Sequence, residues 1–252
     1  MRQRFVGCVI GVAVLCAVVR SNAQQTTRFE VATVTRNVSG SAAAGLDMSG
    51  GQVRATNLAL RVLIRQAFDV IDSQIVNAPT WAADERYDVI AKAPEGITGA
   101  AMRPLLRMLL AERFKLATHT EMRDMPVYGL TKTASSTTPG LRETTRDCAT
   151  NPGGGAAIDP TDQWPMCSVS LKPGLLYIGG FRMSVVTRQL AGLVGMPVLD
   201  ETSITTPVQF RLEYQPADLF TALEQQTGFK LVSKSAPVEV VVVDSAERPT
   251  AN

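Results

Sequence analysis

The feature that most constrains how this chain can fold is an order of short elements that occurs twice. The apolar pattern predicts strand, helix, strand, helix, strand, strand in each half of the chain. The junction after the second helix is nearly the same in both halves, Phe114-Lys-Leu and Phe229-Lys-Leu, and a proline, Pro126 or Pro237, leads each last strand. We therefore predict two tandem copies of one small α+β module, with two unrelated α+β units as the alternative.

The individual elements follow from periodicity and from turn residues. In the first half, strands are expected at 29–35, 52–56, 87–93, 114–121 and 127–132, and helices at 60–68 and 102–110. In the second half, strands are expected at 175–181, 208–214, 229–233 and 238–243, with helices around 186–194 and 219–223. Asn57 stands in an N-cap position before the first helix. Two helices and a small sheet in each copy predict helices packed on one sheet face. The other sheet face would be covered by the other copy, by a partner or by solvent.

The N-terminus has the order of a secretory signal peptide. Arg2 and Arg4 precede an apolar run of 15 residues from Phe5 to Val19, and Ser21-Asn-Ala supplies small residues before Gln24. The run is shorter than the roughly 20 residues that a spanning helix needs. We predict cleavage near Ala23, with residues 1–23 as the signal peptide and a periplasmic or secreted mature protein. An uncleaved membrane anchor is the alternative.

Charge argues against nucleic acid as a partner. Loss of residues 1–23 removes three arginines and no acidic residue, which changes the formal charge from +2 to −1. The mature chain has no run of Lys or Arg, so it lacks the basic patch that binds DNA or RNA. No later segment is long and apolar enough to predict a membrane span.

Two cysteines, Cys148 and Cys167, remain in the mature chain with 18 residues between them. In an oxidising compartment such a pair predicts a disulfide, which would stabilise by about 3 kcal/mol. Both lie in a region rich in Ser, Thr, Gly and Pro. The predicted organisation is therefore a first module at 24–133, a linker at 134–173 and a second module at 174–252.

The sequence contains no recognisable set of catalytic residues. The single histidine, His119, is expected on a solvated strand face with Lys115 and Glu121. One histidine makes a His-rich zinc site impossible within this chain, and no Gly-x-Ser-x-Gly, Ser-x-x-Lys or phosphate-binding glycine motif occurs. We expect no catalytic site, no metal and no cofactor.

Carboxylate pairs are the remaining candidates for a catalytic site. Asp159 and Asp162 in the linker lack the dense oxygen spacing of a calcium loop, and Asp200-Glu201 is expected to start a turn. Two carboxylates facing each other between the modules would suit glycoside hydrolysis. A carboxylate-based hydrolase of the cell envelope is therefore the alternative function.

Two tryptophans are candidates for contacts with a partner. Trp81 follows Pro79 and either lines a binding groove or, the interpretation we prefer, covers the core. Trp164 lies inside the expected disulfide loop and is the better candidate for an exposed aromatic contact. The β-prone runs at 175–178 and 240–243 would permit strand addition by a partner if either were an edge strand. We prefer buried central strands for both.

Five segments are characteristic when taken together: Phe29-Glu-Val-Ala-Thr-Val, Gly51-Gln-Val-Arg-Ala-Thr-Asn, Leu110-Ala-Glu-Arg-Phe-Lys-Leu, Met125-Pro-Val-Tyr and Ala236-Pro-Val-Glu-Val-Val-Val-Val-Asp-Ser-Ala-Glu-Arg-Pro. With these segments the chain resembles a soil-associated exported family that is abundant in Acidobacteria and classed as a domain of unknown function. The resemblance implies an exported protein with many paralogues, sometimes fused to a membrane metallopeptidase of the antibiotic-sensor type. The resemblance identifies no catalytic residue in this chain.

A second resemblance concerns the module. The segment from Asp218 to Leu231 is similar to the short N-terminal domain of secretins and TonB-dependent receptors, an interaction module of the periplasm. The function we expect is a non-enzymatic binding protein of the envelope. Its partner would be an unknown protein or peptide, with a membrane sensor peptidase as one possibility.

Overall fold

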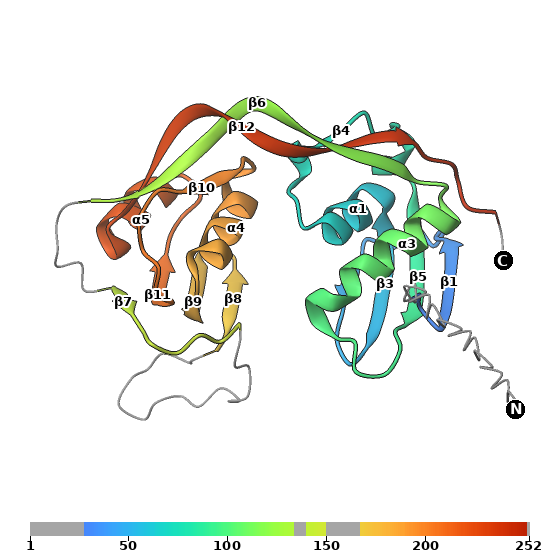
Figure 1. Ribbon diagram of the computed structural model, residues 1–252, viewed down its shortest axis with the longest axis horizontal. Coiled ribbons are helices and arrows are strands. Elements are labelled where there is room, and N and C mark those ends of the chain that lie inside the picture. The colour runs from blue at the N-terminus through green and yellow to red at the C-terminus, as the bar shows by residue number, and fades with distance from the viewer. Residues whose placement is uncertain (1–27, 134–139, 150–166, 251–252) are drawn as a thin grey trace, which may run out of the picture.

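A computed structural model describes residues 28–133, 140–149 and 167–250 of the chain. They form two lobes that lie side by side under a long two-stranded ribbon (Figure 1). The predicted signal peptide, Trp164, Asp159 and Asp162 lie outside the described residues. Within those residues, no helix has the length and apolar character needed to cross a membrane.

The first lobe is a four-stranded antiparallel sheet in the order β1-β5-β3-β2, covered on one face by helices. Its strands are β1 Val31–Arg36, β2 Gly45–Asp47, β3 Gln52–Ala59 and β5 Arg86–Lys92. Its helices are α1 Leu60–Phe68, α2 Trp81–Asp84 and α3 Arg103–Arg113, with short 3₁₀ turns at Asp72–Gln74 and Gly99–Met102. The apolar stripes of α1 and α3 pack on the alternate buried residues of β3 and β5.

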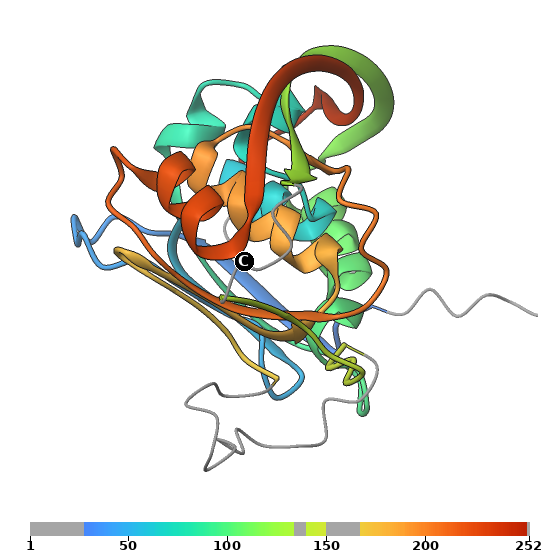
Figure 2. The ribbon, with the colours of Figure 1, turned by 90° about the vertical axis from the view of Figure 1, so that its left-hand side faces the viewer.

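The second lobe has a sheet in the order β7-β11-β9-β8, also antiparallel. Its strands are β7 Leu141–Glu143, β8 Val169–Lys172, β9 Leu175–Phe181 and β11 Val208–Glu213, and its helices are α4 Met183–Val194 and α5 Leu219–Thr227. The helices lie on the same side of the sheet layer in both lobes (Figure 2). The α+β fold class predicted from the sequence is confirmed.

The two sheets agree in register as well as in strand order. Ala55 pairs with Val89 in the first sheet, and Ile178 pairs with Phe210 in the second. In both sheets the ladder then shifts by a bulge, where Asn57 has φ 55° and Gly180 has φ 77°. Three residues later α1 and α4 begin. Descent of the two lobes from one duplicated module stays a prediction.

Asn57 is not the N-cap that the sequence suggested. It lies within β3, and Ala59 precedes α1 without a side-chain cap. The backbone N–H of Asn57 donates to Asp88 at 2.8 Å, and its side-chain amide donates to the carbonyl oxygen of Ser41 at 2.6 Å. Asparagine tolerates the left-handed conformation that the bulge needs. The bulge, and not a helix cap, therefore explains why an asparagine stands at position 57.

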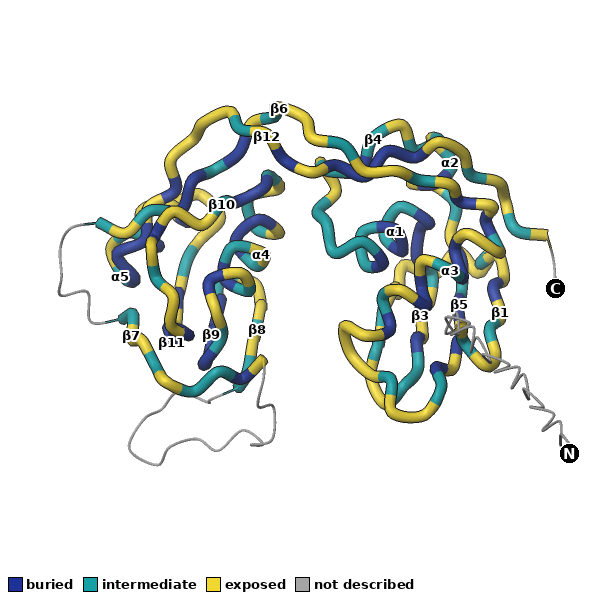
Figure 3. The backbone as a smooth tube through the Cα atoms, viewed as in Figure 1, coloured by how far each residue is buried: buried dark blue, intermediate teal, exposed yellow. Residues whose placement is uncertain are grey.

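The ribbon consists of two long strands, β6 Ala117–Lys132 and β12 Phe229–Ser245, paired antiparallel along nearly their whole length. Two short strands extend it: β4 Ile75–Val76 pairs with β12, and β10 Val198–Asp200 pairs with β6. The sequence predicted a break in each long strand, at residues 122–126 and 234–237, and this prediction was wrong. Many exposed residues lie along the middle of the ribbon (Figure 3).

In an antiparallel pair, every second residue of a strand directs its backbone N–H and C=O toward the partner strand, and the residues between direct theirs outward. This alternation, which we call the hydrogen-bond phase of a residue, explains why prolines do not interrupt these strands. The N–H of Tyr128 donates away from β12, to the carbonyl of Pro197, so even-numbered residues of β6 direct their backbone groups outward. Pro126 is one of them. Pro237, which pairs with Asp124, has the same phase on β12. A proline at such a position removes no bond between the two strands.

Each long strand ends in the lobe that the other half of the chain builds. Val241 and Val243 of β12 are buried in the core of the first lobe, and Leu130 of β6 is buried in the core of the second. The ribbon therefore places residues from both predicted modules in each hydrophobic core.

The region predicted as a linker, 134–173, contains more structure than its composition suggested. It supplies β7 and β8, the two edge strands of the second sheet. Cys148 and Cys167 form the predicted disulfide, with Cα atoms 5.0 Å apart. Their backbone N–H groups donate to Gly180 and Gly179 of β9. The disulfide therefore fastens this region to the second sheet.

Candidate functional site

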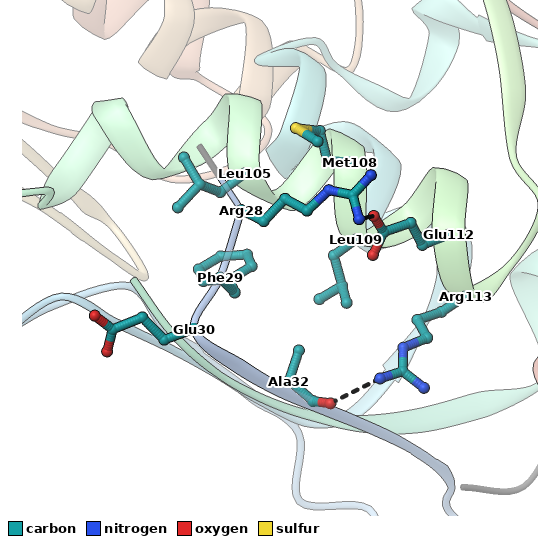
Figure 4. A pocket seen from close by; sticks show the side chains of 9 residues that line it. All are labelled: Arg28, Phe29, Glu30, Ala32, Leu105, Met108, Leu109, Glu112 and Arg113. Carbon is teal, nitrogen blue, oxygen red and sulfur yellow. Dashed lines mark hydrogen bonds and ion pairs between the residues drawn. The ribbon is translucent and has the colours of Figure 1, made fainter. Parts of the chain in front are cut away.

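A groove between the outer edge of β1 and helix α3 is the candidate site. We call it the β1–α3 groove, and it encloses about 240 Å³ (Figure 4). Four residues of the strand side and five of the helix side line it: Arg28, Phe29, Glu30 and Ala32, and Leu105, Met108, Leu109, Glu112 and Arg113. Across the groove Arg28 lies against Glu112 of the helix, and Arg113 reaches Ala32 of the strand (Figure 4).

The helix forms the apolar wall because of its periodicity. Leu105 and Leu109 are four residues apart and lie on one face of α3, where each is almost completely buried. Met108 stands beside them and is half-buried, and a methionine side chain adapts readily to different apolar shapes. Phe29 completes the apolar lining from the strand side. Because Leu105 and Leu109 are almost completely covered, most of the exposed lining of the groove is polar.

Charged side chains surround this apolar lining. Arg28 pairs with Glu112 at 2.9 Å, and Glu30 pairs with Lys92 at 3.4 Å. The Nη2 atom of Arg113 donates to the carbonyl oxygen of Ala32 at 3.1 Å (Figure 4). The groove therefore has apolar side chains in its helix wall, and its exposed lining is mainly polar and carries both signs of charge.

The strand side of the groove is the edge of a sheet. β1 is the first strand in the sheet order, and within the described residues no strand pairs with its outer side. The N–H of Asn37 donates inward to Arg86 of β5, so Ala32, Val34 and Arg36 direct their backbone groups outward. The carbonyl that Arg113 reaches is one of these outward groups. Such an edge can pair with an additional strand.

The corresponding place in the second lobe is closed. There the chain before β7 packs directly on α5, and a Cβ atom built on Gly140 would overlap the carbonyl oxygen of Gln226. Gln226 in turn holds both backbone groups of Glu213 on β11. Of the two equivalent strand–helix positions, the one in the first lobe has the space for a ligand.

Another hollow, of about 400 Å³, lies on the outer side of α5. Phe220 stands in it with 44% of its surface exposed and makes an edge contact with Tyr128 at 5.3 Å between ring centroids. This hollow lies between α5 and the start of β12, at Lys230 and Leu231. We regard the β1–α3 groove as the better site because, within the described residues, the outer side of β1 is open along its whole length.

Trp81 does not line the groove. Its ring packs partly buried against the first core, and the guanidinium of Arg248 lies 5.2 Å from the ring centroid. Arg248 also pairs with Glu85 at 2.7 Å, and this hydrogen bond lowers the pKa of the Glu85 carboxyl. Burial raises the pKa of Tyr87, which donates to Glu85, to about 12. Trp81 thus helps to fasten the C-terminal segment, and its role in partner binding stays a prediction.

The polar residues singled out from the sequence lie apart from the groove as well. His119 is half exposed on β6, with Nδ1 2.8 Å from Asp244 and Nε2 3.8 Å from Glu121. Asp200 accepts from the backbone N–H and hydroxyl of Thr202, as a turn-starting residue does, and Glu201 pairs with Lys234. No group of His, Cys, Asp or Glu suited to a metal ion occurs in residues 28–133, 140–149 and 167–250.

Sequence reasoning missed the groove because its residues have other plausible roles. Leu105 and Leu109 belong to the apolar stripe of α3, a pattern that predicts core residues, and both do pack in the core. One signal was available: Met108 continues the apolar surface of the helix beyond that stripe. The distance between β1 and α3 depends on tertiary packing and has no local sequence signal.

Comparison with known proteins gives a family and nothing more specific. A family model described as "Protein of unknown function (DUF3738)" matches residues 61–246. The helix side of the groove lies inside this range, and β1 precedes it. No curated protein and no solved structure matches the chain.

Proposed function

The chain belongs to the DUF3738 family of proteins of unknown function, and we propose that it is an exported, non-enzymatic protein that binds an extended peptide segment. The segment would add to the outer edge of β1 as a fifth strand of the first sheet. The observation that carries this proposal is the β1–α3 groove, where an open strand edge adjoins a groove along helix α3.

Strand addition uses two features that the groove provides. Backbone bonds to the outward groups of β1 would supply affinity for any extended chain. Because side chains alternate in a strand, every second side chain of the added segment would point toward α3. One apolar side chain between Leu105, Met108 and Leu109 would then supply selectivity.

The proposed location is the periplasm or the extracellular space. The N-terminal sequence supports export, and the disulfide between Cys148 and Cys167 is of the kind that persists in an oxidising compartment. Unfolded or extended segments of envelope proteins are available there as ligands. Export itself is part of the proposal.

The alternative of an envelope hydrolase receives no specific support. Asp69, at the contact between the lobes, accepts one arginine on each oxygen: Arg103 at 2.8 Å and Arg188 at 3.0 Å. Glu201 is paired with Lys234. These carboxylates are engaged in ion pairs.

A charge placed in the groove tests the proposal. We would select peptides from a random display library with the purified protein, residues 24–252, and then measure their affinity for Met108→Arg. We expect a loss of at least about tenfold, because burying an unpaired guanidinium under the bound segment is unfavourable. Gln225→Arg, which adds the same charge on the exposed side of α5, is the matched control and should bind normally. Equal affinities for all three proteins would contradict a ligand in the groove.

A further inference from the structure

The last described residues of the chain, 246–250, lie on the first lobe beyond the end of β12, on the side that faces away from the second lobe (Figure 1). We call them the C-terminal segment. Ala246 packs partly buried against the first core, and the backbone N–H of Glu247 donates to the carbonyl oxygen of Phe114 at 2.6 Å. Arg248 then reaches two side chains of the lobe, Trp81 and Glu85.

The carboxyl group of Glu85 is positioned by the lobe itself. Glu85 directly follows α2, its backbone N–H donates to the carbonyl oxygen of Trp81 at 2.9 Å, and its side chain is only 13% exposed. Its Oε2 atom accepts from the hydroxyl of Tyr87 at 3.0 Å, and Arg36 of β1 lies 3.7 Å from the same oxygen. Tyr87 is buried and makes an edge contact with Phe114 in the core. The orientation of this carboxylate is therefore fixed without the C-terminal segment.

The other carboxylate oxygen, Oε1, receives the guanidinium of Arg248. The Nε atom of Arg248 donates to Oε1 at 2.7 Å, and Nη2 lies at the same distance from it. The guanidinium carbon is 5.2 Å from the centroid of the Trp81 ring. A carboxylate beside an indole face suits a guanidinium in particular, because its planar group can form hydrogen bonds and contact the ring at once.

The C-terminal segment is held less firmly than the groups it contacts. The side chain of Arg248 is 58% exposed, and the chain ends only four residues later, at Asn252. Segments at a chain end detach at a small cost in free energy. Detachment takes from Oε1 of Glu85 the N–H groups that it accepts from, and another guanidinium can replace them. A fixed carboxylate and a readily detached arginine together permit exchange.

We propose that Trp81 and Glu85 form a binding site for an arginine-bearing segment of a partner protein, and that Arg248 occupies this site in the free protein. The site lies outside the β1–α3 groove and does not depend on it. Because Arg248 is part of the same chain, its effective concentration at the site is on the order of millimolar. The C-terminal segment therefore restricts binding to partners that add further contacts to that of their arginine.

A variant that vacates the site tests the proposal. Arg248→Ala removes the internal arginine from residues 24–252, and the probe is N-acetylarginine amide. Its binding is followed by NMR through the indole N–H of Trp81, a resonance that is absent from Trp81→Phe. We expect the probe to bind the variant about tenfold more tightly than the native protein, as it would if the site were open about a tenth of the time in the native protein. N-acetylcitrulline amide, a neutral probe of the same shape, should bind at least about tenfold more weakly to the variant.

Two further changes separate the site from general effects on the segment. Glu247→Ala alters the neighbouring exposed residue, keeps Arg248 and should behave like the native protein. Glu85→Gln, combined with Arg248→Ala, should abolish probe binding although glutamine can still accept from Tyr87. If that double variant does not fold, as judged by circular dichroism, Trp81→Leu in the Arg248→Ala background takes its place and should weaken binding several-fold.

Two results would overturn the proposal. One is equal binding of the arginine and citrulline probes to Arg248→Ala, or equal binding of the arginine probe to this variant and to the native protein. The other is dimerisation of the native protein in analytical ultracentrifugation that Arg248→Ala abolishes. That result would assign the site to the C-terminal segment of a second copy and not to a partner protein.

Discussion

At the scale of single residues, backbone conformation and local charge explain the role of residues whose type alone allows more than one role. Asn57 and Gly180 both adopt positive φ at the bulge before a helix, and each is a residue type that tolerates it. From the sequence, Asn57 suggested a helix cap because asparagine serves both purposes. Only the pairing with β5 shows which purpose it serves.

The bulge predicts a stability difference between two substitutions of one residue. Asn57→Ala should destabilise the protein by about 1–2 kcal/mol, since alanine is strained in the left-handed region and lacks the side-chain bond to Ser41. Asn57→Gly keeps the conformation and should cost less. Urea unfolding of both variants measures the difference, and an alanine variant as stable as the glycine variant would contradict this account of the bulge.

His119 is the single histidine, so one NMR resonance reports its titration. The hydrogen bond with Asp244 raises its pKa above the ordinary value of 6.5. The stabilisation from this contact is complete below pH 6.5 and is lost as the pH rises through the higher pKa of the folded state. Asp244→Asn should lower the measured pKa, whereas Asp124→Asn, elsewhere on the ribbon, should not. An unchanged value in Asp244→Asn would show that another group causes the shift.

At the scale of elements, periodicity predicted most helices and strands but not the continuity of the ribbon. Proline and aspartate between two apolar runs usually indicate a turn. In β6 and β12 they mark instead the part of the ribbon where neither short strand, β4 nor β10, pairs with the outer edge. Whether a proline ends a strand depends on its hydrogen-bond phase, which a single sequence does not reveal.

The phase argument predicts opposite outcomes for adjacent positions. Asp124→Pro places a proline with its nitrogen outward and should be tolerated, like Pro126 beside it. Met125 pairs with Ala236 and directs its N–H inward, so Met125→Pro should destabilise by roughly 1–3 kcal/mol through a lost ladder bond. Thermal unfolding compares the two variants. Equal losses of stability would mean that the phase assigned to β6 is wrong.

At the scale of the whole molecule, the exchange of strand ends makes the two lobes depend on each other. The sequence predicted two successive modules and gave no sign that β12 returns to the first core or that β6 reaches the second. Such long-range pairing depends on the ribbon being continuous. The groove also depends on tertiary packing, because it exists only where a packed helix meets the edge of a complete sheet. The sequence alone therefore does not predict it.

This exchange predicts that neither half folds alone. Residues 24–133 lack Val241 and Val243, and each buried valine contributes about 1.5–3 kcal/mol to a domain of marginal stability. We expect residues 24–133 and 134–252 to lack cooperative unfolding separately and to regain it when refolded together. Circular dichroism with urea measures this. Independent cooperative folding of residues 24–133 would contradict the interdependence.

The central claim, that a peptide adds to the edge of β1, is tested most directly by hydrogen exchange of the backbone amides. With a selected peptide bound, the outward amides of Ala32, Val34 and Arg36 should gain protection, whereas the β7 and β8 edges of the second lobe should not change. Protection elsewhere, with the amides of Ala32, Val34 and Arg36 exchanging as fast as in the free protein, would contradict the claim.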